Sequence, residues 1–126
     1  MTTDIYTYGR SATERVESIR GYIKALKEDL ARSMIEAVET DSYFPAERIA
    51  KAANQIAEKE GALEVAHLVQ HAEDNGASPE SLTRMLLREA VRSADDTWSG
   101  RGNDVRRAFA DGRRDAIDDA MLELIS

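Results

Sequence analysis

The chain has 126 residues, of which 42% are hydrophobic, so it can build one core and is too short for two independent domains. Its formal charge of −7 disfavours non-specific binding to nucleic acid, because a polyanion is repelled unless basic residues gather on one face. The absence of cysteine excludes disulfides and thiolate metal sites and suits a reducing compartment, so we predict a cytoplasmic protein. No apolar run reaches the length of a membrane span, and residues 1–10 lack the pattern of a signal peptide, so we expect no membrane association.

The first predicted elements are a short arm and a long helix. Residues 1–10 alternate weakly between apolar and polar side chains and predict an extended arm. Ser11 and Glu14 form an S-x-x-E capping box, which predicts that a helix begins there and runs to about Thr40. Apolar residues then recur at spacings of three and four, at Val16, Ile19, Ile23, Leu26 and Leu30. This heptad helix, about 40 Å long, exceeds what a compact bundle of this size needs, so we expect these five residues to form an oligomer interface.

A second helix is expected after a turn at residues 41–44, because Pro45 preorganises a first helical turn. Its apolar residues fall into two groups that point more than a quarter turn apart, namely Ile49, Ala52 and Ile56, then Ala62, Leu63, Ala66 and Val69. Gly61 separates the groups, and glycine is a poor residue inside a helix. The sequence therefore predicts a break or kink at Gly61.

Two further helices complete the predicted fold. Asn75-Gly76 predicts the end of one helix, and Ser78-Pro79 predicts the cap of the next, with Leu82, Leu86 and Ala90 facing inward. Residues 95–103 contain two glycines and predict a loop. Asn103 or Asp104 then caps a last helix, whose inward row is Val105, Phe109, Ala116, Ala120 and Leu124 and in which Gly112 permits a close approach. We therefore predict one all-α domain over residues 1–126, with an arm at 1–10 and a bundle of four to five helices at 11–126.

A metal site on the second helix is weakly indicated. Glu64, His67 and His71 have the spacing of residues on one helix face, and the first two form the Glu-x-x-His unit of di-iron bundles. A di-iron site needs a second such unit, and the chain has only these two histidines. The three side chains also point away from Leu63, Ala66 and Val69. We favour a solvated face and predict neither a metal nor another cofactor.

Residues 68–87 resemble a helix-turn-helix DNA-binding motif, with Gly76 in the turn and Leu82 and Met85 at later core positions. The resemblance implies that the helix from Pro79 enters the major groove and that Ser81, Thr83, Arg84 and Arg88 contact DNA. Polar residues stand where the motif needs apolar ones, at His71 and Asn75, and Glu80 brings negative charge to the groove. Glu80 and Glu89 are also placed to pair with the row Arg84, Arg88 and Arg92. We therefore favour two bundle helices joined by a glycine turn.

The last 43 residues carry eight basic side chains, and all of them are arginine. This composition suits a surface that grips carboxylate or phosphate, and codon bias in a GC-rich genome explains it equally well. Arg113 falls on the apolar face of the last helix, which calls for an acidic partner within the fold. The alternative is a site for a phosphorylated or nucleotide-like ligand at the start of that helix, built from Trp98, Arg101, Arg106 and Arg113.

No arrangement typical of an enzyme stands out in the sequence: there is no strand-turn-helix nucleophile elbow, and paired carboxylates are common on amphipathic helices. We therefore expect a non-enzymatic regulatory or adaptor protein that binds another protein and forms dimers or larger homo-oligomers. DNA binding and binding of a small anion stay open as alternatives. Small size, acidity and the lack of catalytic motifs also suit a protein of a bacteriophage or mobile element.

Overall fold

The computed structural model describes residues 12–99 and 104–125, and the side chains of these residues except 95–99. Four α-helices make up the described chain, and it contains no strand. They are α1 (Ala12–Glu39), α2 (Ala46–Asp74), α3 (Pro79–Ser99) and α4 (Asp104–Ile125). The predicted all-helical class is therefore confirmed. The predicted arm at residues 1–10 lies outside the described residues.

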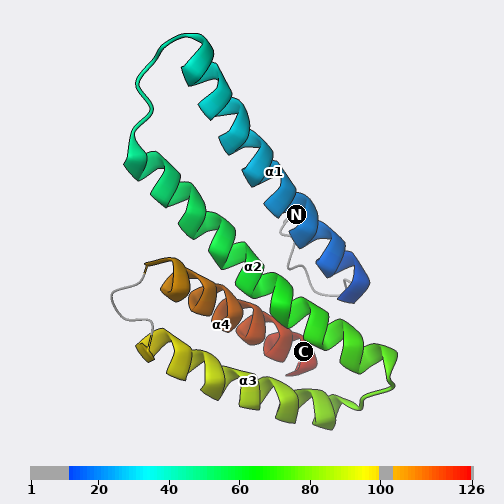
Figure 1. The fold of residues 1–126 in the computed structure, drawn as a ribbon. Helices are drawn as coiled ribbons and strands as arrows, with labels where there is room; N and C mark the ends of the chain where they lie inside the picture. Colours follow the sequence, from blue (N-terminus) through cyan, green and yellow to red (C-terminus); the bar gives the residue numbers. More distant parts are fainter. Residues whose placement is uncertain (1–11, 100–103, 126) are drawn as a thin grey trace.

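The helices form two antiparallel hairpins that overlap along only part of their length (Figure 1). The first hairpin, α1–α2, is the longer one, and the α3–α4 hairpin packs beside the second half of α2. Helix α2 is the centre of the fold because it contacts both α1 and α4, whereas α3 packs mainly against α4. The far ends of α1 and α2 project beyond the other two helices (Figure 1).

Local signals in the sequence explain where the helices end. After α1, the Ser42 N–H donates to the Ala37 carbonyl at 2.8 Å, and Asp41 between them adopts a left-handed φ of 51°. After α2, Gly76 has a φ of 75°, and the Ala77 N–H donates to the Ala72 carbonyl at 3.0 Å. Both are Schellman-type ends, in which a left-handed residue closes the last turn. The predicted glycine turn at residue 76 is confirmed.

The predicted break at Gly61 is wrong, because α2 is continuous from Ala46 to Asp74. Gly61 is instead a packing position. A Cβ there would meet the Phe109 carbonyl oxygen of α4, and a Cβ on Gly112 would meet the Glu58 carbonyl oxygen of α2. Helices α2 and α4 thus cross at two glycines whose missing side chains let the backbones touch. The predicted close approach at Gly112 is confirmed.

The rotation of the apolar face of α2 follows from its neighbours. Along its second half α2 is buried on two sides. Ala62 and Ala66 lie with Val16, Ile19 and Ile23 of α1 in one core cluster, while a second cluster joins α2 to α3 and α4 through Val65, Val69, Leu82, Leu86, Ile117 and Ala120. Near its start, before the crossing with α4 at Glu58 and Gly61, α2 has only α1 beside it among the described helices (Figure 1). A change in the number of neighbours therefore turns the apolar face along one continuous helix.

Two other expectations for the second hairpin are wrong. Helix α3 continues to Ser99, so residues 95–99, predicted as loop, are helical, because Gly100 is the first helix breaker in this stretch. Val105, predicted to face inward, is exposed in the first turn of α4. That turn precedes the crossing with α2 at Phe109 and Gly112, so nothing in the described residues covers it.

No helix among the described residues is long and apolar enough to cross a membrane.

Candidate interaction surfaces

The distal arm, defined here as residues 24–56, is the part of α1 and α2 that projects beyond α3 and α4 (Figure 1). None of its residues is fully buried. It nevertheless carries many large apolar side chains that are exposed or half-buried, namely Leu26, Leu30, Met34, Ile35, Val38, Tyr43, Phe44, Ile49 and Ile56. Few soluble proteins expose so many large apolar side chains together unless they bind something.

The predicted oligomer row of α1 has two parts in the structure: one is buried within this subunit, and the other is still accessible. Val16, Ile19 and Ile23 are buried in this subunit against Ala62 and Ala66, so they are not available to a second copy. The other two residues of the predicted row are half-buried on the distal arm, at Leu26 and Leu30. The spacing continues from there to Met34, which is 40% exposed. Only the distal end of the row is therefore open.

Polar contacts hold the two helices of the distal arm together weakly. Arg48 donates to the Ser33 hydroxyl at 3.5 Å, and the Lys27 ammonium lies 3.7 Å from a Glu60 carboxylate oxygen at the base of the arm. The Arg48 guanidinium also lies 5.0 Å from the centroid of the Phe44 ring. Exposed contacts of this kind each contribute at most about 1 kcal/mol. These contacts are too weak to supply the stability that a buried apolar core would give the arm.

Arg113 forms a buried polar cluster across three helices. Its side chain is 2% exposed and pairs with Glu64 of α2 and Glu89 of α3, and its Nε donates to the fully buried Ser93 hydroxyl at 3.0 Å. Desolvation by burial lowers the pKa of the guanidinium from its ordinary value. The predicted acidic partner of Arg113 is confirmed. Sequence reasoning placed Glu89 on the outer face and missed Ser93.

A pattern in α3 shows how Glu89 and Ser93 could have been found. Leu82, Leu86, Glu89 and Ser93 follow one another at spacings of four, three and four, so all four lie on one helix face. The first two are core residues, and the last two continue the same row toward Arg113. An apolar row that ends in polar residues opposite a core arginine predicts a buried ion pair.

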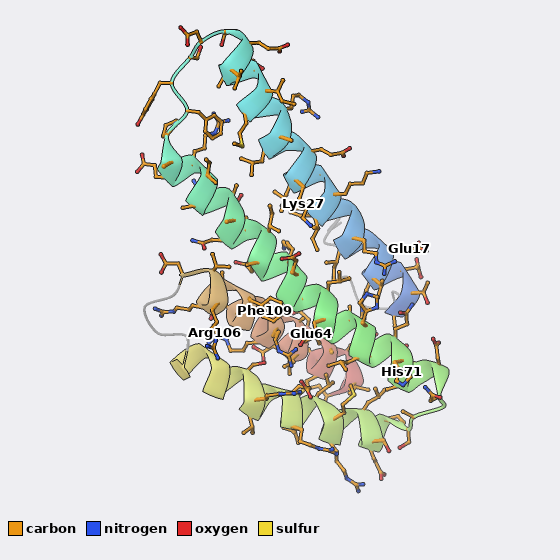
Figure 2. The ribbon with its side chains drawn as sticks, viewed as in Figure 1. Glu17, Lys27, Glu64, His71, Arg106 and Phe109 are labelled. Atoms are coloured by element: carbon orange, nitrogen blue, oxygen red, sulfur yellow. The ribbon has the colours of Figure 1, made fainter. Side chains whose placement is uncertain are left out.

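Of the predicted anion site, only the side chains of Arg106 and Arg113 lie among the described residues. The Arg113 guanidinium is buried and already paired with two carboxylates, so it is not available to a ligand. Arg106 lies near the start of α4 with an exposed side chain, whereas Glu64, a partner of Arg113, comes from α2 (Figure 2). The side chain of Trp98 and all of Arg101 lie outside the described residues.

The three residues that were considered as a metal site, Glu64, His67 and His71, do not converge. Glu64 binds Arg113, and His71 lies near the end of α2, apart from it (Figure 2), where its ring contacts the Asn75 side chain at 3.4 Å. His67 is half-buried between these positions on the same helix. The described residues contain no group of three histidine, aspartate or glutamate side chains that would hold a metal ion.

The helix-turn-helix candidates all lie on α3 but differ in exposure. Ser81, Arg84 and Arg88 are exposed, whereas Thr83 is half-buried and donates to the Pro79 carbonyl at 2.8 Å. Ser78 caps the helix, since its hydroxyl accepts from the Ser81 N–H at 3.2 Å. Because α3 packs mainly on α4 and follows a 29-residue helix, the pair α2–α3 lacks the compact two-helix packing of the motif.

Comparisons of the chain with protein-family models, with curated proteins and with solved structures give no significant match. The function therefore has to be argued from these surfaces.

Proposed function

We propose that this chain is a non-enzymatic interaction protein that self-associates through the distal arm. A second copy lays its own arm on the first, and the two helical hairpins form an intermolecular four-helix bundle. The observation that carries the proposal is the absence of any fully buried residue from Lys24 to Ile56, across two helices rich in large apolar side chains.

The first supporting argument is energetic. Two helices that contact only each other leave the outer side of their apolar row exposed to water. Isolated helices of this length are only marginally stable. Full burial of one leucine, isoleucine or methionine side chain is worth about 1.5–3 kcal/mol relative to its exposed state. The partial burial of Leu30, Met34 and Ile49 leaves much of this free energy unused. Docking of a second arm recovers it and gives each copy the core that it lacks.

The second argument is electrostatic. The whole chain has 24 acidic and 17 basic residues, so two copies repel each other on average. The distal arm has six acidic and five basic residues and is therefore almost neutral. Two arms can approach with little repulsion, while the acidic charge stays on the parts of the molecule that remain apart.

The third argument is geometric. The α1 part of the arm is about 24 Å long at 1.5 Å per residue, and the hairpin is two helices wide, about 20 Å. One face of the arm therefore covers a flat area of about 500 Å². Its solvent-accessible area is larger, because the side chains make the surface uneven. A standard interface buries about 800 Å² per partner. The same patch on both copies suits a two-fold dimer, the most common homo-oligomer.

Sedimentation equilibrium over a wide concentration range tests the proposal. The wild-type protein should be a dimer, and Met34→Asp should shift it toward monomer because it places a charge in the proposed bundle core. Ile35→Asp is the matched control, since Ile35 is the next residue, is 59% exposed and lies about 100° around the helix from Met34. A monomeric wild-type protein at every concentration, or equal effects of the two variants, would contradict the proposal.

A further inference from the structure

The outer face of α3 combines exposed apolar and basic side chains. Leu87 is 51% exposed and Val91 is 73% exposed, and the two lie one helical turn apart. Arg84, Arg88 and Arg92 run beside them at the same spacing and are all exposed. This face, called here the α3 outer face, has an apolar column and a basic column side by side.

The packing of α3 explains why this face is open. Helix α3 makes its main contacts with α4, through the row that contains Leu82, Leu86 and Ser93. The α3 outer face lies on the opposite side of the helix from that row. No other helix of the described chain therefore covers Leu87 or Val91.

Neither of the two acidic residues that were expected to neutralise the basic column, Glu80 and Glu89, forms an ion pair with Arg84 or Arg88 in the described part of the chain. Glu89 turns inward to Arg113, and its side chain is only 14% exposed. It retains one outer contact, at 3.4 Å to Arg92, whose side chain is still 69% exposed. Within the described part of the chain, Arg84 and Arg88 have no ion-pair partner. Two unpaired cations therefore lie on the surface of an acidic protein.

We propose that the α3 outer face binds an acidic amphipathic helix of a partner protein. Two apolar side chains of that helix would pack on Leu87 and Val91, and carboxylates one turn apart would pair with Arg84 and Arg88. The apolar column distinguishes this partner from nucleic acid, because Leu87 and Val91 have no counterpart on a phosphate backbone. The surface is separate from the distal arm, so the proposal does not depend on self-association.

Fluorescence anisotropy with a synthetic peptide tests this proposal. The probe is a labelled helix of about 18 residues with leucine at every third or fourth position and flanking glutamates, and the control probe has lysine in place of each glutamate. The full-length protein should bind the acidic probe, with an affinity that falls as salt is raised. Arg84→Glu combined with Arg88→Glu should weaken binding about tenfold or more, and Leu87→Asp should also weaken it. Any binding of the lysine probe to the acidic remainder of the protein should not weaken in the Arg84/Arg88 variant.

Matched variants separate the surface from general charge effects. Arg107→Glu combined with Arg114→Glu changes the net charge by the same amount on exposed positions of α4 and should leave binding unchanged. Met34→Asp should also leave it unchanged, which separates this result from the dimer. Equal losses in the two arginine pairs, or no binding of the acidic probe, would overturn the proposal.

Two other occupants are distinguished by the same proteins. A DNA duplex of about 20 base pairs tests the first of these occupants. If it binds more tightly than the acidic peptide, and if the Arg84/Arg88 variant loses that binding, the α3 outer face binds nucleic acid and the proposal is overturned. If the Met34→Asp protein still self-associates, and if adding Arg84→Glu and Arg88→Glu abolishes this self-association, the occupant of the α3 outer face is a second copy. That result also overturns the proposal of a separate partner.

Discussion

The two ends of α2 show how the same kind of helix is used in two ways. Its second half lies between α1 and α4 and contributes Gly61, Ala62, Val65, Ala66 and Val69 to the interior. Near its start only α1 lies beside it (Figure 1), and it contributes no fully buried residue before Ala57. The described residues outside the distal arm, called here the proximal region, therefore have a buried core, whereas the distal arm has no fully buried residue. The difference in burial follows from the number of neighbouring helices.

The largest expected effect comes from the contact that makes the proximal region complete. Gly112→Ala places a Cβ against the Glu58 carbonyl, so α2 and α4 have to move apart. We expect the free energy of unfolding to fall by about 4 kcal/mol, at the upper end for overpacking because the clash is with backbone. Urea denaturation followed by circular dichroism measures this loss. A loss below about 1 kcal/mol would show that the two helices can separate at little cost.

The buried ion-pair cluster should give the next largest effect. Arg113→Met keeps the apolar stem but leaves Glu89 and Ser93 buried without their cation. We expect a loss of about 3 kcal/mol, measured by the same denaturation experiment. Arg114→Met removes the exposed pair with Asp111 and is the neighbouring control, with an expected change below about 0.5 kcal/mol. Similar values for both variants would mean that the cluster adds no more than a surface ion pair.

A third pair of variants compares the two regions along one helix. Ile23→Ala removes a buried side chain of the proximal core and should cost about 2.5 kcal/mol at every protein concentration. Leu30 is half-buried, so Leu30→Ala should cost less in dilute solution, and the proposed dimer predicts a larger cost as concentration rises. Thermal unfolding at several concentrations measures both. A cost for Leu30→Ala that does not change with concentration would show that the arm is no more than a loose extension of the monomer.

Much of the fold could be read from the sequence because its signals are local. The heptad spacing, Pro45, the Asn75-Gly76 turn and the Ser78 cap each depend on a few neighbouring residues, and the four helices follow from them. The break at Gly61 was a wrong prediction because glycine has two uses in a helix. It weakens an exposed helix, and it also lets another backbone approach, and only the position of α4 distinguishes these cases.

The candidate surfaces were less predictable, because they depend on which side chains the fold removes from the surface. The sequence predicted one oligomer row in α1, and the position of α2 divided it after Ile23. It also predicted that Glu80 and Glu89 neutralise the arginines of α3. Glu89 instead pairs with the buried Arg113, since a buried guanidinium without carboxylates would cost several kcal/mol. On the outer side of α3, Glu89 keeps only its contact with Arg92.

The smallest expected effect lies at the border between the two regions. Gly21 is an exposed position inside α1, one and a half turns after the buried Val16, and a Cβ there would meet no atom within 4 Å. Gly21→Ala should therefore raise the free energy of unfolding by about 0.8 kcal/mol, through helix propensity and a less flexible unfolded chain. The midpoint of thermal unfolding should rise by about 3 °C. The same substitution at Gly61 meets the Phe109 carbonyl and should destabilise. Opposite signs at the two glycines would show that Gly21 lies on an open face of α1 and Gly61 at a helix crossing, whereas a loss at Gly21 would mean that α1 has a neighbour on that face.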